Sequence, residues 1–167
     1  MNDTQPDKLE ALHILDNATE KRAFCKRLCD ELNIRGVLSV LKDGVKHKHL
    51  TFDFYYVRPS EGNETAASYY QKNRFSVIRQ LHYSKSHPKH ALDICLFLNG
   101  LPLITMELKN QLTKQNVEDA VEQYQLDRDP RELLFSFKRC MVHFAVDDAE
   151  VRFCTKLAGK DSWFLPF

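Results

Sequence analysis

Several features that often identify a protein at once are missing from this sequence. No apolar run approaches the roughly 20 residues that cross a bilayer, and the polar start MNDTQPDKLEAL is not a signal peptide. The GxxxxGK(S/T) motif of nucleotide-binding P-loops is absent. The five cysteines form no CxxC pair, which disfavours zinc, and their odd number suits a reducing compartment. We therefore expect a cytoplasmic chain that meets no membrane and binds no ATP.

An excess of charge of one sign is also missing. The chain has 24 Lys and Arg against 23 Asp and Glu, a formal net charge of +1. Any binding of nucleic acid must therefore come from a local patch rather than from the charge of the whole domain. The length of 167 residues and the hydrophobic content of 43% fit one globular core. We expect a single domain over 1–167, in which residues 1–16 form a poorly ordered lead-in or a short helix.

Hydrophobic periodicity predicts an alternation of helices and strands. Asn17 followed by Glu20 resembles a helix start, apolar residues then recur at helical spacing, and Gly36 ends the helix. Residues 51–57 alternate as in a strand, whereas 68–84 are ambiguous between helix and strand. The remaining expected elements are strands at 91–98 and 101–109 joined by Asn99-Gly100, a helix at about 116–126, and strands at 138–146 and 150–157.

This order predicts the α/β class, with a mixed sheet flanked by helices. The strand at 102–109 and the strand at 138–146 are separated by the helix at 116–126. Because a strand–helix–strand crossover joins parallel strands, we expect these two strands to be parallel.

Charged residues interrupt both arms of the expected hairpin. Asp93 breaks the run ALDICLFL, and Glu107 and Lys109 break ITMELK. Strand side chains alternate between faces, so Glu107 and Lys109 share one face. The core is expected on the opposite face, formed by Ile104, Met106 and Leu108. Two simpler explanations of the acids remain open: a solvated sheet face, or an acid paired with a nearby lysine.

The chemistry that uses two acids and one ammonium group on a shared face is phosphodiester hydrolysis. Carboxylate oxygens hold hard divalent cations. Such a cation polarises a phosphate and lowers the pKa of bound water, and a neighbouring lysine orients the water or offsets negative charge. Asp93, Glu107 and Lys109 are therefore a candidate nuclease site.

The hairpin register decides whether the two acids can meet. A regular two-residue Asn99-Gly100 turn pairs Leu92 with Glu107, and Asp93 then points to the other face. A three-residue loop or a bulge places Asp93 opposite Glu107, and Pro102 makes an irregular ladder plausible. We therefore predict a bulge or an odd-length loop in this hairpin.

The stretch LDICLFLNGLPLITMELKNQLTKQN resembles the nuclease core of type I restriction subunits, a family of the PD-(D/E)xK nuclease superfamily. The resemblance continues through DAVEQYQLDRDPRELLFSFKRCMVHFAVD to TKLAGKDSWFLPF, and GVLSVLKDGV and NRFSVIRQLHYS are similar to the family's lead-in. It covers roughly residues 18–167. The NGLPL-x₃-ELKN stretch is its specific part, whereas a lone Glu-x-Lys is common.

The resemblance implies roles for four residues of the hairpin. Asp93 matches the first metal-binding acid, although Leu92 stands where the superfamily name has Pro. Glu107 matches the second acid, the Leu108 backbone carbonyl is implied as a further metal ligand, and Lys109 matches the catalytic lysine.

Further residues are implied around this centre. Gln123 matches the Gln of the family's Q-x₃-Y motif and is implied to assist catalysis and contact DNA. Asp127 stands where the motif has Tyr, so that Tyr124 is a candidate to replace it at the DNA. Glu20 matches a position where an acid approaches the metal, although a glutamate here also stabilises a helix start.

Two basic clusters are candidates for tracking DNA phosphates. One precedes Asp93 and contains Lys85 and Lys89 together with His82, His87 and His90. The other contains Lys42, Lys46, His47, Lys48 and His49. Such clusters are more often simply a solvated surface.

The family resemblance implies a restriction-endonuclease-like core and a type I site-specific deoxyribonuclease that cleaves double-stranded DNA with Mg²⁺. It implies modification and specificity subunits as partners, and ATP-driven motor domains in the full-length subunit that are not in this chain. Two alternatives remain: a non-catalytic docking module of the same fold, and a repair nuclease of the same superfamily.

Overall fold

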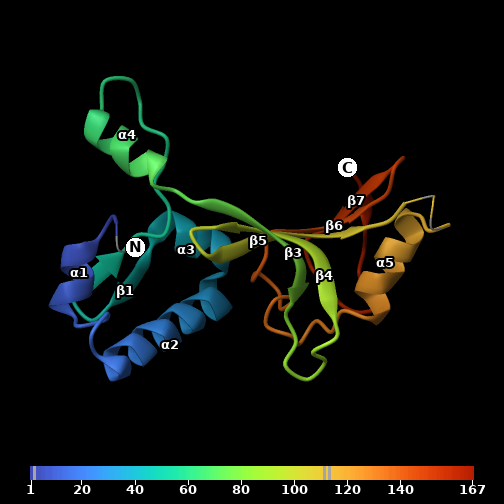
Figure 1. Ribbon diagram of the computed structural model, residues 1–167, viewed down its shortest axis with the longest axis horizontal. Coiled ribbons are helices and arrows are strands. Elements are labelled where there is room, and N and C mark those ends of the chain that lie inside the picture. The colour runs from blue at the N-terminus through green and yellow to red at the C-terminus, as the bar shows by residue number, and fades with distance from the viewer. Residues whose placement is uncertain (2, 111, 113) are drawn as a thin grey trace. The chain divides into compact units, whose positions relative to one another are not determined.

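The computed structural model describes residues 1, 3–110, 112 and 114–167. The chain forms two compact units, Met1–Arg74 and Phe75–Phe167 (Figure 1). No shift in composition marks this division, and the expectation of a single nuclease domain stays a prediction. Helices and strands occur together in each unit, and the larger sheet is mixed, so the α/β class is confirmed.

The N-terminal unit is mainly helical. Asn17 caps its longest helix by accepting hydrogen bonds from the backbone N–H groups of Thr19 and Glu20, at 2.9 and 3.2 Å. That helix ends at Gly36, whose φ of 84° is costly for other residues, so both predicted ends are confirmed. The described elements of this unit are α1 (Pro6–Ala11), α2 (Ala18–Arg35), α3 (Val37–Asp43), β1 (Val45–His47), β2 (Leu50–Phe52) and α4 (Glu64–Gln71).

The expectation of a poorly ordered lead-in at 1–16 is wrong for the described residues there, and the alternative of a short helix is confirmed. Helix α1 buries Leu9, and Leu12 and Ile14 behind it are also buried. These side chains contribute to the core of the N-terminal unit. The segment is polar on average, but these three apolar side chains are enough to pack the short helix and the residues that follow it against the core.

The strand expected over 51–57 extends only through Phe52. Beyond it, side-chain amides take the place of a neighbouring strand. Gln5 donates to the Asp53 carbonyl at 2.8 Å and accepts from the Asp53 N–H at 2.9 Å. Asn73 binds the N–H and C=O of Tyr56 in the same way, at 3.1 and 2.7 Å. The backbone stays satisfied without a ladder because each amide offers one donor and one acceptor side.

The C-terminal unit contains a mixed six-stranded sheet within its described residues. The strand order is β3-β4-β5-β6-β7-β8, and only the β5–β6 pair is parallel. The parallel pairing predicted across the intervening helix is therefore confirmed. The elements are β3 (Phe75–His82), β4 (Ala91–Leu98), β5 (Leu101–Leu108), α5 (Val117–Leu126), β6 (Val142–Val146), β7 (Val151–Cys154) and β8 (Leu165–Pro166).

Helix α5 packs against β5 and β6 through a buried polar contact as well as apolar ones. Tyr124 of α5 is fully buried, and its hydroxyl is hydrogen-bonded to Thr105 Oγ1 at 2.8 Å. The same Thr105 oxygen lies 2.7 Å from Nδ1 of the buried His143 on β6. This network of hydrogen bonds joins α5 to the neighbouring strands β5 and β6. It therefore fixes where α5 sits along β5.

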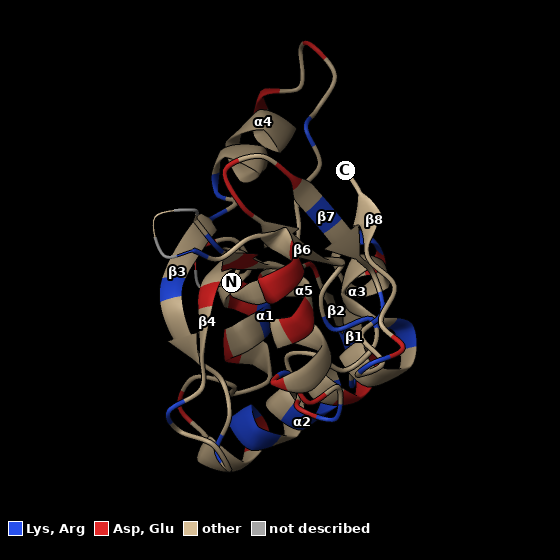
Figure 2. Ribbon diagram, turned by 90° about the vertical axis from the view of Figure 1, so that its right-hand side faces the viewer, with Lys and Arg blue, Asp and Glu red and all other residues tan. Residues whose placement is uncertain are grey.

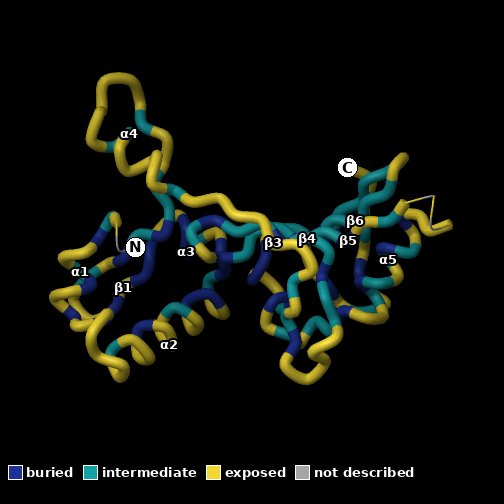
Figure 3. The backbone as a smooth tube through the Cα atoms, viewed as in Figure 1, coloured by how far each residue is buried: buried dark blue, intermediate teal, exposed yellow. Residues whose placement is uncertain are grey.

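Burial varies strongly across the sheet. Most of β3 is exposed, whereas β5 and β6 contain fully buried positions (Figure 3). Among the described residues, no helix is both long enough and apolar enough to cross a membrane.

Candidate active site

The β4–β5 hairpin contains the irregularity that the sequence required. Asn99 and Gly100 both have positive φ, 50° and 86°, as a tight two-residue turn needs, and Leu98 pairs with Leu101. The register then shifts after the pairing of Phe97 with Pro102, and Ile94 is opposite Met106. The residue left out of the pairing is Leu103, whose carbonyl accepts from the Met141 N–H at 2.8 Å. The predicted bulge is confirmed.

The bulge brings Asp93 to the Glu107 position of β5, one step beyond the Ile94–Met106 pair. Asp93 Oδ2 accepts a hydrogen bond from the Leu108 N–H at 2.8 Å. The N–H and C=O of one strand residue point to the same side, so the Leu108 carbonyl also faces Asp93. The first acid therefore lies beside the second, close enough to raise the pKa of Glu107.

Gln80 holds the other oxygen of the first acid and was not identified from the sequence. Its Nε2 donates to Asp93 Oδ1 at 2.8 Å. Gln80 lies within β3 with a φ of 51°, a left-handed backbone that is costly for a residue with a Cβ, and the ladder to β4 omits it. Strained backbone of this kind often occurs where a side chain must be aimed.

Glu107 lies on the buried face of β5, and the predicted assignment of the two faces is wrong. Glu107 and Thr105 are fully buried, whereas Ile104 and Met106 are only partly buried and Leu108 is 41% exposed. The physical reason is that α5 covers the Thr105–Glu107 side of the strand. The apolar residues of ITMEL lie on the opposite side, and the acid lies under a helix.

Arg128, directly after α5, is the partner of the buried acid, and sequence reasoning missed it. Arg128 Nε donates to Glu107 Oε1 at 2.6 Å, and the two side chains are 3% and 0% exposed. Burial raises the pKa of Glu107 to about 7, against the lowering effect of Arg128, and the nearby Asp93 carboxylate raises it further. A charge run in RDPREL ordinarily indicates a solvated loop, so no local signal marked this arginine.

Lys109 is held by the helix that covers the site. Its Nζ donates to Gln123 Oε1 at 2.6 Å, which joins two of the predicted catalytic residues. Asn116 and Asp119 form a reciprocal capping box at the start of α5, and the Val117 N–H binds Asp147 Oδ2 at 2.9 Å. The start of α5 is thus fixed to the end of β6, and the position of Gln123 follows from it.

Tyr124 of α5 and the C-cap residue Asp127 differ sharply in exposure. Tyr124 does not present its ring to DNA, because it is fully buried and its hydroxyl is bonded within the core. That expectation is corrected: the residue next to Gln123 on a covering helix faces the sheet. Asp127, in the place of the motif's Tyr, is the exposed C-terminal cap of α5.

Glu20 is paired within the N-terminal unit, and the two lysines of the basic cluster that precedes Asp93 are exposed. Within the N-terminal unit, Glu20 accepts from the Lys48 ammonium at 2.6 Å, and this bond lowers its pKa. Glu20 thus forms a salt bridge, and the approach to a metal implied for it stays a prediction. In the C-terminal unit, Lys85 and Lys89 are exposed on the β3–β4 loop, where DNA phosphates can reach them.

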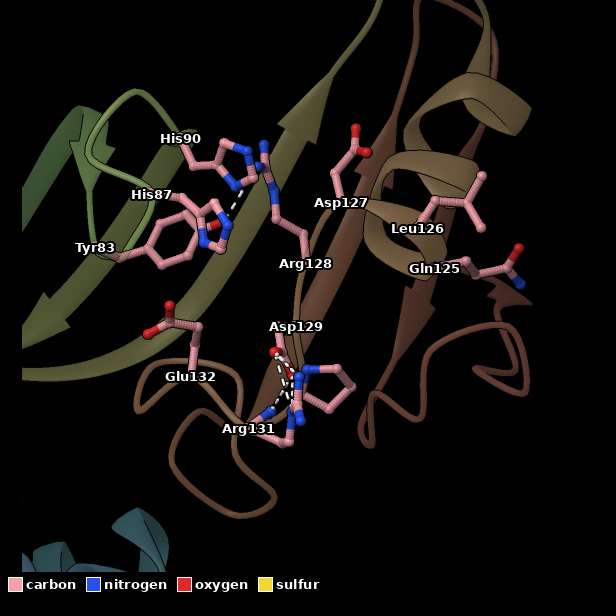
Figure 4. A pocket seen from close by; sticks show the side chains of 11 residues that line it. Tyr83, His87, His90, Gln125, Leu126, Asp127, Arg128, Asp129, Arg131 and Glu132 are labelled. Atoms are coloured by element: carbon pink, nitrogen blue, oxygen red, sulfur yellow. Dashed lines mark hydrogen bonds and ion pairs between the residues drawn. The ribbon is translucent and has the colours of Figure 1, made fainter. Parts of the chain in front are cut away.

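A pocket of about 410 Å³ lies beside the buried ion pair. Figure 4 shows the Arg128 side chain extending into it toward Tyr83 and His90, with Asp129 and Arg131 paired at one edge. The rings of His87 and His90 are stacked, with centroids 5.0 Å apart. Neither Asp93 nor Lys109 lines this pocket.

Charges of both signs are interspersed over the chain. In Figure 2, Asp and Glu positions appear on α5, whereas Lys and Arg positions appear on β3 and β7. At the candidate site itself, two carboxylates are matched by the guanidinium of Arg128 and the ammonium of Lys109.

The donor set fits a hard divalent cation. No group of three or more His, Cys, Asp and Glu side chains that could hold a metal occurs within residues 1, 3–110, 112 and 114–167. The two acids and the Leu108 carbonyl, however, are all oxygen donors of the kind that Mg²⁺ takes alongside water. Glu107 Oε2 is buried and has no hydrogen-bond partner, which leaves one carboxylate oxygen of the second acid free for an ion.

The fold and the site together define a class of protein: an α/β chain in which a bulged hairpin sets two acids side by side, with a lysine following the second. The family model for the N terminus of the type I restriction enzyme R protein matches residues 3–162. The chain therefore belongs to this family. No curated protein and no solved structure gives a significant match.

Proposed function

We propose that this chain is an Mg²⁺-dependent endonuclease domain that cleaves double-stranded DNA as part of a type I restriction subunit. The observation that carries the proposal is the bulge at Leu103, because it is the feature that sets Asp93 opposite Glu107. Membership of the restriction R-protein family supports a nuclease role within a multi-subunit complex on DNA. The mixed sheet with α5 across its parallel pair is compatible with a restriction-endonuclease-like core.

The residues that would hold the cation are Asp93, Glu107 through Oε2, and Leu108 through its carbonyl. A bound Mg²⁺ would neutralise phosphate charge and acidify a water molecule. The chain's own residues would hold the ligand oxygens in position. Gln80 and the Leu108 N–H fix the two oxygens of Asp93, so the first acid needs little reorganisation when an ion arrives.

Lys109 would act on the phosphate and the attacking water. Its ammonium is held at 2.6 Å by Gln123, so it is oriented by α5 rather than left to solvent. Water would attack phosphorus, the bond to the 3′ oxygen would break, and a 5′-phosphate would remain. Lys109 would orient that water and offset the negative charge that develops on the phosphate.

DNA would be bound through its backbone rather than its bases. Lys85 and Lys89 are exposed and adjoin the strand that carries Asp93, so phosphates are their natural partners. Sequence recognition and translocation would belong to the specificity subunit and the motor domains of the whole enzyme. With a net charge of only +1, the chain is expected to bind DNA weakly and in a salt-dependent way.

Replacing Asp93 with asparagine is expected to abolish nicking of supercoiled plasmid by the full chain in Mg²⁺. Asn keeps the size of the side chain and one acceptor oxygen, but it removes the charge that holds the cation. We expect a loss of about 10²-fold or more, as for removal of one preorganised electrostatic contact. The measurement is conversion of supercoiled to open-circular DNA on a gel.

Asp161→Asn provides the matched control, since Asp161 is an exposed acid of the same unit outside the site. It should leave nicking and folding unchanged. Nicking that persists in Asp93→Asn would remove Asp93 from the mechanism. If the wild-type chain neither nicks DNA nor shows a Glu107-dependent thermal shift with Mn²⁺, the non-catalytic docking module becomes the better account.

A further inference from the structure

The ion pair between Arg128 and Glu107 has a one-sided geometry. Arg128 Nε donates to Glu107 Oε1 at 2.6 Å, and Nη2 lies 2.6 Å from the same oxygen. Oε2 receives no hydrogen bond. The usual Arg–carboxylate fork satisfies both oxygens, and an unpartnered buried oxygen costs free energy. The arrangement therefore leaves one oxygen of a buried acid available at an energetic cost.

Arg128 is itself fixed by two groups that are not acids. Nη1 donates to the Tyr83 hydroxyl at 3.1 Å, and Nη2 donates to the Ala91 carbonyl at 2.9 Å. Ala91 begins β4 and precedes Asp93 by two residues. The planar guanidinium thus connects the second acid to the strand that carries the first.

The side from which Arg128 reaches Glu107 is marked by a pocket. The Arg128 side chain lies in the pocket with Tyr83, His87 and His90 (Figure 4). Asp93 and Lys109 are not in the lining of that pocket. Arg128 therefore reaches Glu107 from the side of this pocket, whose lining does not include Asp93 or Lys109.

We infer that Arg128 is the positioning residue of the metal site: it holds Oε1 of Glu107 so that Oε2 is presented toward Asp93. This inference rests on the proposed function. It differs from a passive buried ion pair, which would affect only folding, and from a latch, in which the guanidinium would compete with the cation for Glu107. Outer partners of metal ligands typically change affinity by about 10–100-fold when they are removed.

The test is Mn²⁺ binding by the full chain, measured from the loss of the free-ion electron paramagnetic resonance signal. Arg128→Lys keeps the charge but cannot reach three partners in one plane, and it should weaken Mn²⁺ binding by about tenfold or more. Tyr83→Phe removes one of the two hydrogen bonds that hold the Arg128 guanidinium, and it should cause a smaller loss of Mn²⁺ affinity. Asp161→Asn is the control: it removes the charge of an exposed acid of the same unit outside the site, and it should leave Mn²⁺ affinity unchanged.

A double-variant cycle separates this inference from the proposed function. Glu107→Gln alone should weaken Mn²⁺ binding, and adding Arg128→Lys to it should cause no further loss. If Glu107→Gln weakens binding but Arg128→Lys binds Mn²⁺ as tightly as wild type or more tightly, the metal site stands and the positioning role is overturned. If Glu107→Gln has no effect, the metal site and the positioning role fail together. Should Arg128→Lys not fold by circular dichroism, Tyr83→Phe decides, and unchanged affinity there overturns the inference.

Discussion

Replacing Lys109 with methionine is expected to lower the rate of Mg²⁺-dependent DNA cleavage by about 10²–10⁴-fold, the range for loss of a positioned acid–base or electrostatic group. Methionine keeps the length and flexibility of the side chain and removes only the ammonium. Lys109 is partly exposed and its described partner is Gln123, so water can replace the lost contact and the fold should persist. Initial rates of plasmid nicking at saturating Mg²⁺ measure the effect.

The Lys109 variant also separates chemistry from metal binding. Because Lys109 is not a proposed ligand, Mn²⁺ affinity should stay close to that of wild type. Lys160→Met is the matched control, since Lys160 is an exposed lysine of the same unit. Cleavage that survives Lys109→Met, or a collapse of Mn²⁺ affinity in that variant, would contradict the role assigned to the ammonium.

Acid should destabilise the chain through His143. Burial lowers the pKa of this side chain to about 4, so the folded chain keeps it neutral while the unfolded chain protonates it near pH 6.5. Between these values the unfolded state binds the extra proton, and stability falls as the pH falls. A pKa shift of this size lowers the free energy of unfolding by about 3 kcal/mol once the pH has fallen to the folded-state pKa.

Urea unfolding of the full chain at several pH values, followed by circular dichroism, isolates this contribution when wild type is compared with His143→Gln. Glutamine is neutral throughout, and the other titrating groups are common to both proteins. The variant should be less stable at pH 7, because a buried hydrogen bond to Thr105 is perturbed. The difference in free energy of unfolding between wild type and the variant should shrink by about 3 kcal/mol on acidification to pH 4. Parallel stability curves for the two proteins would refute a neutral, buried His143.

The features of the site that were predictable from sequence came from local rules. Side-chain alternation and the length of an Asn-Gly turn required a bulge between Asp93 and Glu107, and the structure has one at Leu103. Helical spacing and a capping residue located α5 to within one residue of its observed start, and Gln123 with it. Each of these conclusions depends on residues close together in the chain.

Tertiary contacts explain what could not be predicted. Alternation places Glu107 and Leu108 on opposite faces of β5, but it does not say which face a helix covers, and the polar face proved to be the buried one. Arg128 lies 21 residues beyond Glu107 in a charged turn, and only the folded chain brings them together. The extended segment after Phe52 is likewise satisfied by Gln5 and Asn73, which are distant in sequence.

Diffraction from crystals of the chain grown with Mn²⁺ gives the most direct test of a cation held between the hairpin acids. The anomalous signal should show an ion bonded to the Asp93 carboxylate, Glu107 Oε2 and the Leu108 carbonyl, with Arg128 still on Oε1. An ion found elsewhere at saturating Mn²⁺, with Oε2 of Glu107 still unligated, would contradict the account.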